Sequence, residues 1–213
     1  TDVGRSTVPP APAVAPFRDE GTWPTELKGI TLGDAGVKGV EGDKSLSEGR
    51  GGFLFAHFGL SGPSPLDVSK AIARHDSPRT LRLEIDFLPS RTPNEFDEFL
   101  RAESLASGKK QLSVVLSDLL PRRLCDSLLS LTSQPPDRKA AGLSKADRAK
   151  LVESVKRNRL PVLGTLGFEK AEVTSGGVSL DEVDSRSMQS KLVSGLYLAG
   201  EILDLDGPIG GYN

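Results

Sequence analysis

The sequence predicts an α+β fold in which a small helical bundle is inserted into an antiparallel β-barrel. Short apolar segments separated by glycine occupy residues 27–58, which is typical of strands joined by tight turns. Helix-capping residues and apolar stripes fill residues 92–159, and strand patterns return from Pro161. We therefore expect domain boundaries near residues 88–92 and 159–161.

The first part of the predicted barrel covers residues 1–91. Its first 28 residues contain five prolines, which disfavour a helix and favour extended or edge segments. Apolar segments at 27–32, 37–40 and 53–58 have the length of strands, and the charged stretch 41–48 predicts a solvated hairpin. A helix is expected over 65–75, followed by a strand over 80–87 where apolar and charged residues alternate.

Residues 92–159 are expected to form a subdomain of four helices. Thr92 is an N-cap residue, a proline follows it, and Glu95 completes a capping box; this helix ends near Gly108. Pro121 separates the second helix from the third, and Ser144 caps the fourth. Each apolar stripe is narrow, so the helices have to pack against one another or against the barrel.

Residues 160–190 are expected to return the chain to the barrel and to connect it to the last segment. Strands are predicted at 162–166, 170–174 and 178–183. Gly176 and Gly177 lie between the last two, and a glycine pair in this position is a hairpin signal.

Residues 191–213 begin a different pattern. The short apolar run 196–199 is typical of a strand that is buried on both faces. Gly200 and Glu201 follow it, then acidic residues that alternate with apolar ones, then a glycine-rich loop. This combination is typical of a ligand site at the carboxyl end of an α/β sheet, because glycine lets backbone N–H groups approach a ligand closely. The alternative is a strand followed by an ordinary glycine-rich loop.

Three blocks of residues resemble motifs of one family of bacterial flavoproteins, the NAD(FAD)-utilising dehydrogenases, in the family's order. They are FAHFGLSGP at 55–63, TSGGV at 174–178 with the EVD and SMQSK that follow, and GE, LDLDG and GGYN between 200 and 213. The resemblance extends to aminoacetone-oxidase-like and bile-acid-reductase-like members. It implies that residues 1–190 are the family's barrel and helical insert. It also implies that residues 191–213 are a remnant of its FAD-binding, Rossmann-like α/β domain.

The resemblance implies a flavin-dependent oxidoreductase that binds FAD, acts on a small-molecule substrate and has NAD(P)H as a candidate electron donor. The insert would shape the substrate side of the flavin. The cofactor-binding residues implied by the resemblance are Thr174, Gly176, Gly177, Gly200, Glu201, Asp206, Gly207, Gly210, Gly211, Tyr212 and Asn213. His57 and Tyr212 are candidates for proton donation, although no catalytic residue is identified. The alternative for His57 is a histidine that is hydrogen-bonded inside the barrel and fixes its turn.

The chain contains no G-x-G-x-x-G motif, the turn that holds a dinucleotide pyrophosphate at a helix N-terminus. We therefore expect the chain to be a fragment of the flavoprotein and to bind FAD only weakly by itself. Whether the fragment alone is an enzyme stays open. The competing hypothesis is a non-catalytic module that docks a protein or RNA, in which the glycines are purely structural.

The net charge of −2 predicts neither nucleic acid nor an anionic membrane as a partner, since both favour a basic surface. Basic residues do cluster at 122–123 and 156–159. We interpret these clusters as solvated surface, because acidic neighbours accompany them and no aromatic residue is interleaved.

Cys125 is the only cysteine, which excludes an internal disulfide and fits a reducing compartment. No metal-ligand motif is present, so no metal site is predicted. Neither a signal peptide nor an apolar run of ~20 residues is present, and we expect a cytoplasmic protein. The substrate and the oligomeric state stay open.

Overall fold

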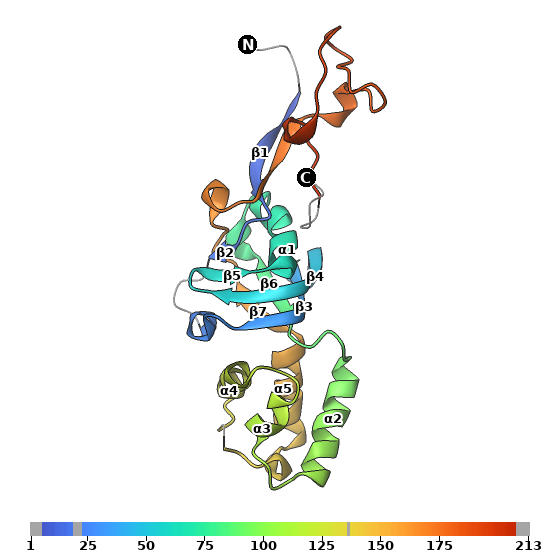
Figure 1. Ribbon diagram of the computed structural model, residues 1–213. Helices are drawn as coiled ribbons and strands as arrows, with labels where there is room; N and C mark the ends of the chain where they lie inside the picture. The colour runs from blue at the N-terminus through green and yellow to red at the C-terminus, as the bar shows by residue number, and fades with distance from the viewer. Residues whose placement is uncertain (1–5, 19–22, 136, 208–213) are drawn as a thin grey trace.

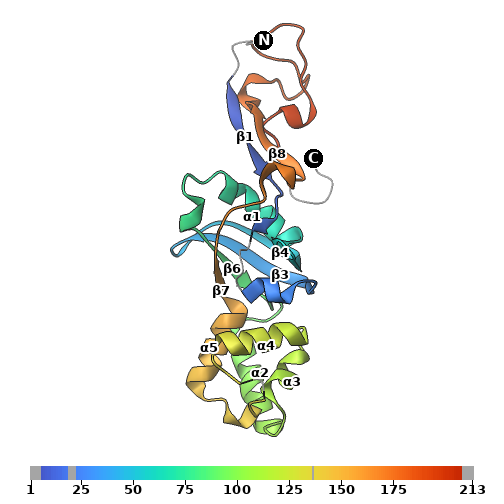
Figure 2. The same cartoon turned by 90° about the vertical axis from the view of Figure 1, so that its left-hand side faces the viewer.

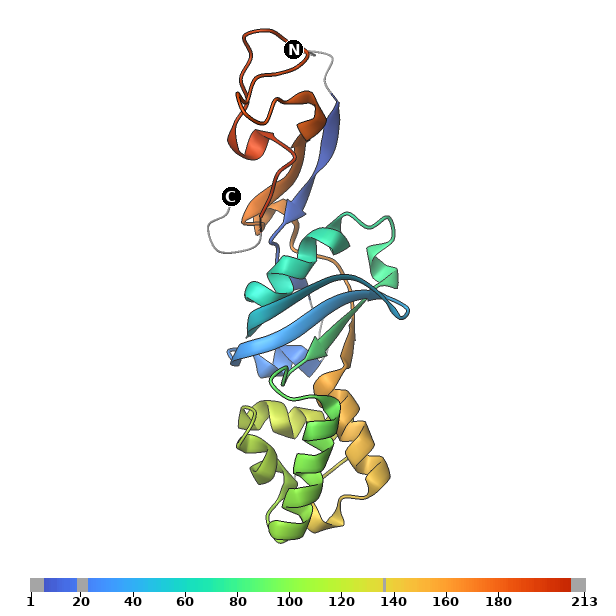
Figure 3. The same ribbon diagram turned by 90° about the vertical axis from the view of Figure 1, so that its right-hand side faces the viewer.

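A computed structural model describes residues 6–18, 23–135 and 137–207, and Figure 1 shows three parts along an elongated molecule. At one end, β1 (Thr7–Ala13) and β8 (Val173–Val178) form a two-stranded ribbon beside the C-terminal segment. A six-stranded sheet covered by one helix occupies the middle, and four α-helices form the other end. Figures 2 and 3 show the same order of parts from two other sides.

The centre of the sheet is a long hairpin of β3 (Thr31–Glu41) and β4 (Lys44–Ala56). The expectation of separate strands at 27–32 and 37–40 is therefore wrong. The intervening Gly33 and Gly36 continue the strand. Further along it, Gly39 makes room for the helix above the sheet, since a Cβ there would lie 3.2 Å from the side chains of Val68 and Ile72. Those two residues belong to α1 (Pro63–Ala73), which confirms the helix expected over 65–75 with slightly earlier bounds.

The other strands are β2 (Phe17–Arg18), β5 (Gly59–Ser61), β6 (Arg82–Asp86) and β7 (Asn158–Pro161). They complete the antiparallel order β2-β5-β4-β3-β6-β7. Among the described residues the sheet does not close into a barrel, because β2 and β7 are its edges and a single bridge between Phe17 and Thr165 joins β2 to the chain beyond β7. Pro161 has no N–H with which to extend that edge. The α+β class is confirmed, but a closed barrel is not found.

Four helices lie between β6 and β7 in the sequence: α2 (Pro93–Ala106), α3 (Leu112–Ser117), α4 (Arg122–Leu131) and α5 (Lys145–Lys156). We call residues 93–157 the helical unit. The capping box is present, since the Thr92 hydroxyl accepts a bond from the N–H of Glu95, whose carboxylate accepts one from the N–H of Thr92. Ser144 caps α5, since its hydroxyl accepts a bond from the N–H of Asp147. The domain boundaries expected from the sequence stay predictions.

One apolar core joins the sheet to the helical unit. Phe53, Phe55 and Phe87 pack ring against ring with centroids 4.9–6.2 Å apart, and Trp23 packs on the last two. The same cluster continues into the buried leucines of all four helices. Because the core is continuous, the helical unit is packed against the sheet and not merely tethered to it.

A buried lysine fastens this junction. The Lys156 ammonium lies 2.8 Å from the carboxylate of Asp86 and donates hydrogen bonds to the carbonyls of Leu88 and Arg91. Only 4% of its side chain is exposed, so the expectation that Lys156 belongs to a solvated surface is wrong. The reason is that three oxygens converge on the end of α5 and need a donor.

We predict that Lys156→Ala lowers the free energy of unfolding by about 3 kcal/mol, because it leaves a carboxylate and two carbonyls without their donor. Urea unfolding followed by circular dichroism measures the change. Lys150→Ala is the matched control on the exposed face of α5 and is expected to change stability by less than about 0.5 kcal/mol. Equal effects of the two substitutions would contradict the anchoring role of Lys156.

Candidate functional site

The described part of the predicted cofactor site lies beside the β1–β8 ribbon. Gly176 and Gly177 are inside β8, so the expected hairpin at this glycine pair is wrong. Both have positive φ, +101° and +135°, and each is covered by backbone. A Cβ on Gly176 would lie 2.5 Å from the carbonyl oxygen of Pro9, and one on Gly177 would lie 2.4 Å from that of Ile202. These glycines let three chain segments approach one another, and backbone fills the side of each glycine on which a Cβ would stand.

The strand expected at 196–199 is also absent. Tyr197 forms only an isolated bridge to Gln189, and its side chain is 62% exposed. A strand buried on both faces needs a strand on each side, whereas the described residues pair this run with residues 188–190 alone. A Rossmann-like remnant is therefore not shown. Instead, Leu203 bridges to Val178 of β8 in parallel, and the N–H of Asp204 donates to the carbonyl of Val178.

Gly200 and Glu201 lie at an open edge of this segment. They begin the short 3₁₀ turn η6 (Gly200–Ile202), and both are exposed. Gly200 has φ of +76°, and a Cβ there would meet no atom within 4 Å. Of the described glycines in the predicted site, Gly200 thus has room for a ligand to approach its backbone, and the Glu201 carboxylate beside it is free to accept hydrogen bonds from hydroxyl groups.

Two ion pairs attach residues 204 and 206 to α1. Asp206 pairs with Lys70, and Asp204 pairs with Arg74 at 3.1 Å. Lys70 and Arg74 are four residues apart and so share one face of the helix, while Asp204 and Asp206 alternate along an extended segment. Sequence reasoning missed both cations, although their helical spacing opposite alternating carboxylates is a usable signal. Asp206 thus already has a charged partner, and 7% of its side chain is exposed.

A hollow of about 300 Å³ separates α1 from this segment and is lined by Val14, Glu48, Leu66, Asp67, Lys70, Asp206 and Gly207. The lining contains three carboxylates and one ammonium, and Glu48 also pairs with Lys38 at 3.5 Å. This charge disfavours a phosphate, whereas the hydroxyls of a ribose or ribityl chain could donate to the carboxylates.

The two candidate proton donors are His57 and Tyr212, and the structure describes His57 alone. His57 is exposed in the turn between β4 and β5, where its ring meets Phe58 edge-on with centroids 4.8 Å apart. The alternative of a histidine hydrogen-bonded inside the barrel is wrong for that reason. Tyr212, with Gly210, Gly211 and Asn213, lies outside the described residues. Thr174 is half-buried in β8, and the buried hydroxyl of Ser175 beside it has no described hydrogen-bond partner.

We also searched the described part of the chain for a reactive thiol, a metal site and a membrane-spanning helix. Burial raises the pKa of the Cys125 thiol to about 12, so it stays protonated and is no nucleophile. No group of three or more His, Cys, Asp or Glu side chains among the described residues is arranged to hold a metal ion. None of the described helices has the length and hydrophobicity needed to cross a membrane.

Comparison with known proteins decides the family. Residues 11–173 match the family described as "HI0933-like protein barrel and H2TH domain". The chain belongs to this HI0933-like family. The match covers both the open sheet and the helical unit, so the sheet corresponds to the family's barrel and the helices to its H2TH domain.

Relatives within the HI0933-like family carry two kinds of name. A "Ribosomal RNA dihydrouridine synthase" of Haemophilus influenzae is 32% identical over 212 residues, which are 99% of this chain and 49% of that protein. Its namesake in Escherichia coli is 36% identical over 164 residues, 77% of this chain and 39% of that protein. A "3-dehydro-bile acid delta(4,6)-reductase" of Clostridium scindens is 27% identical over 212 residues, 99% of this chain and 52% of that protein. The chain spans about half the length of these relatives, or less.

These names correct one expectation. Two HI0933-like relatives are named for ribosomal RNA, so the exclusion of nucleic acid partners is wrong. The error lies in the use of a whole-chain charge. Residues 93–157 contain 12 Lys and Arg and nine Asp and Glu, a net charge of +3, whereas the whole chain has −2. The positive charge of the helical unit is thus offset in the whole-chain sum by acidic residues elsewhere in the sequence.

We predict that Gly177→Ala loosens the C-terminal segment, because the new methyl group would collide with the backbone of Ile202. Faster proteolysis or amide exchange in residues 196–207, with α2–α5 unchanged, is the expected result. Gly164→Ala is the matched control: its φ is +126° but a Cβ meets nothing within 4 Å, so it separates backbone strain from collision. Equal loosening by both substitutions would contradict this packing role.

Proposed function

We propose that this chain is part of a flavin-dependent reductase of carbon–carbon double bonds, with a uridine in ribosomal RNA as its substrate. The similarity to the Haemophilus influenzae synthase over 99% of this chain carries the proposal. The basic helical unit supports it, because an RNA-modifying enzyme needs a surface that attracts phosphates.

The two reactions named for the relatives share one chemistry. Dihydrouridine differs from uridine by two hydrogen atoms across a double bond conjugated to a carbonyl. A 3-dehydro bile acid with Δ4,6 unsaturation also contains double bonds conjugated to a carbonyl. Each reduction requires a hydride at a carbon remote from the carbonyl and a proton at another carbon. A flavin, when bound, supplies the hydride, while the protein supplies orientation and a proton donor.

The described residues fit contact with one portion of FAD. The open edge at Gly200 and Glu201, with the acidic hollow beside Asp206, suits hydroxyl groups of the cofactor. The buried hydroxyl of Ser175 also needs a partner. Gly176 and Gly177 would support the site indirectly, because they let β8 pack closely against β1 and against the segment at Ile202. His57 and Tyr212 stay candidates for the proton donor, and NAD(P)H stays a candidate electron donor.

A steroid-like enone is the second candidate substrate, because the bile-acid reductase also matches 99% of this chain. Both candidates are tested with the protein that contains this chain, loaded with reduced flavin. We predict that uridines in a ribosomal RNA fragment gain the mass of two hydrogen atoms, as measured by nucleoside mass spectrometry. Turnover of the steroid dienone without change in the RNA would select the second substrate. If neither is reduced and the protein holds no flavin, the chain is instead part of a binding module.

We predict that this 213-residue chain alone binds FAD with a Kd weaker than about 10 μM. It lacks the glycine turn that presents N–H groups to the pyrophosphate, and each lost charge-assisted bond costs about 1.5–3 kcal/mol. Quenching of flavin fluorescence during titration measures this affinity. In the longer protein, Glu201→Ala should lower the fraction of molecules that carry flavin, whereas Glu169→Ala, another exposed carboxylate, should not. Unchanged flavin content after Glu201→Ala would remove Glu201 from the site.

A further inference from the structure

We infer that the phosphate backbone of an RNA docks on the outer end of the helical unit. The contact surface consists of Lys109, Lys110, Lys139 and Lys145, which we call the lysine tip. All four side chains are exposed. The inference rests on the proposed function, since it assumes an RNA substrate, and it assigns the part of the chain that holds that RNA.

Backbone hydrogen bonds bring the residues of the lysine tip together from two separate loops. The loop after α2 and the loop before α5 form a short antiparallel bridge at Gln111 and Lys139. The N–H of Leu112 donates to the carbonyl of Arg138 at 2.7 Å, and the N–H of Ala140 donates to that of Lys110 at 3.0 Å. The loops are thus held in a fixed arrangement without using any lysine ammonium group.

The second loop is anchored from both sides. The Ser104 hydroxyl of α2 donates to the carbonyl of Ala140, and Gly108 allows close approach, since a Cβ there would lie 2.9 Å from the Cβ of Ala141. On the other side, Arg138 pairs with Asp147 of α5 at 3.0 Å. A rigid surface loses less conformational entropy when it binds, which favours a pre-formed contact.

These loops carry a net positive charge. Residues 107–111 and 137–146 contain five basic residues and one acidic residue, the exposed Asp137. Of the five, Arg138 is the one with a described carboxylate partner. No described ion pair or hydrogen bond involves the ammonium groups of the four lysines of the tip. The nearest carboxylate in the sequence on the α5 side, Asp147, is occupied by Ser144 and Arg138, and its pKa is lowered first by the Ser144 hydroxyl. The four ammonium groups therefore remain available to phosphates.

The composition of the lysine tip determines what it can recognise. Lysine contacts phosphate as a point charge, and neither loop contains an aromatic residue on which a base could stack. Binding at the tip should therefore be independent of base sequence and sensitive to salt. The choice of the uridine has to be made elsewhere in the protein.

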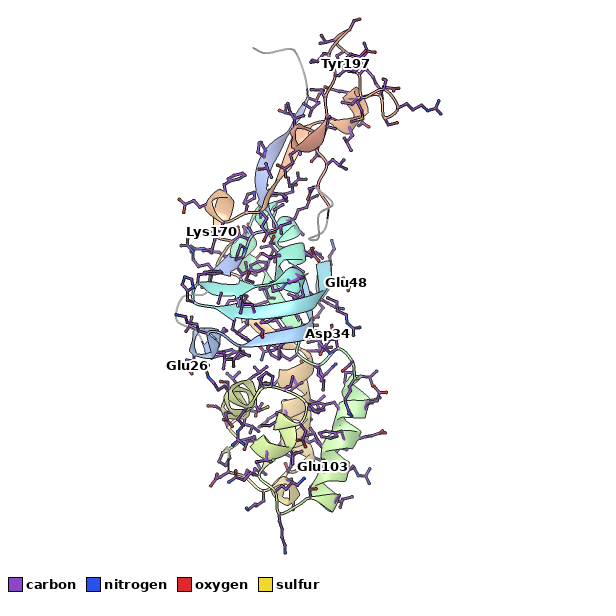
Figure 4. The ribbon with its side chains drawn as sticks, in the orientation of Figure 1. Glu26, Asp34, Glu48, Glu103, Lys170 and Tyr197 are labelled. Carbon is purple, nitrogen blue, oxygen red and sulfur yellow. The ribbon has the colours of Figure 1, made fainter. Side chains whose placement is uncertain are left out.

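The position of the lysine tip sets a requirement on the RNA. Figure 4 shows Tyr197, in the segment with the predicted cofactor edge, at the opposite end of the molecule from Glu103 of α2. The loop after α2 lies at that far end. An RNA that contacts both regions has to extend along the molecule, so a short oligonucleotide cannot reach both.

The test uses the triple variant Lys109→Glu/Lys110→Glu/Lys139→Glu and a structured fragment of ribosomal RNA. Fluorescence anisotropy at several salt concentrations gives the affinity and its salt dependence. We expect binding to weaken by about thirtyfold or more at low salt, and the slope of log K against log salt to fall by about 2 to 3. The control Lys28→Glu/Lys44→Glu/Lys170→Glu makes the same change of charge at exposed lysines outside the helical unit. We expect it to weaken binding by less than about threefold. Circular dichroism verifies that both variants are folded.

The outcomes separate the two proposals. If the unchanged protein binds the RNA and the tip variant binds it equally well, the lysine tip is overturned while the proposed function stands. Equal loss in the tip and control variants also overturns the tip, because net charge alone would explain the loss. If the unchanged protein binds no RNA, both proposals fail. Binding to anionic vesicles that depends on the tip, without RNA binding, would assign this surface to a membrane instead.

Discussion

The close packing of α1 on the β3–β4 hairpin is the contact on which the other parts depend. It requires glycine at Gly49, where a Cβ would lie 2.7 Å from the carbonyl oxygen of Ser64, and it is tight at Gly39, where a Cβ would lie 3.2 Å from the side chains of Val68 and Ile72. With this approach the apolar side chains Val68 and Ile72 reach the core of the sheet, while Lys70 and Arg74 stay on the outer face of the same helix. A larger residue at Gly49 would collide with the backbone of α1 and displace the helix, and the support of the C-terminal segment would move with it.

Charged groups fasten the two outer parts to this centre in different ways. At the helical unit, one buried ammonium satisfies a carboxylate and two carbonyls, so its loss leaves several unpaired groups. At the C-terminal segment, the partners of Asp204 and Asp206 are more exposed cations, and such pairs contribute less to stability. The helical unit is therefore joined more firmly to the sheet than the C-terminal segment is. This difference suits the proposed RNA contact on the helical unit, because a rigid support favours a pre-formed surface.

The sequence predicted best what local chemistry decides. The Thr92 and Ser144 caps, the break at Pro121 and the helix over α1 involve neighbouring residues, and they are confirmed. Predictions failed where the conformation of a residue depends on contact with a segment that is distant in the sequence. Gly176 and Gly177 serve β1 and the segment at Ile202, which no local pattern reveals, and the apolar run at 196–199 lacks strands with which to pair. Much of the candidate site stays a prediction for the same reason. Its ion pairs join residues more than a hundred positions apart, and Gly210, Gly211, Tyr212 and Asn213 lie outside the described residues.

The shared family does not by itself indicate RNA as the substrate. The bile-acid reductase matches this chain over the same 212 residues as the Haemophilus influenzae synthase, so the possession of a helical unit is compatible with either substrate. What differs physically between the two tasks is the need to hold a polyanion. A steroid requires an apolar pocket near the flavin and nothing at the far end of the molecule, whereas an RNA also requires cations away from the reacting base. In this chain the two loops of the lysine tip carry a net positive charge, with Asp137 as their one carboxylate, although acidic residues predominate in the chain as a whole. The position of those charges, more than the fold that carries them, favours RNA as the substrate.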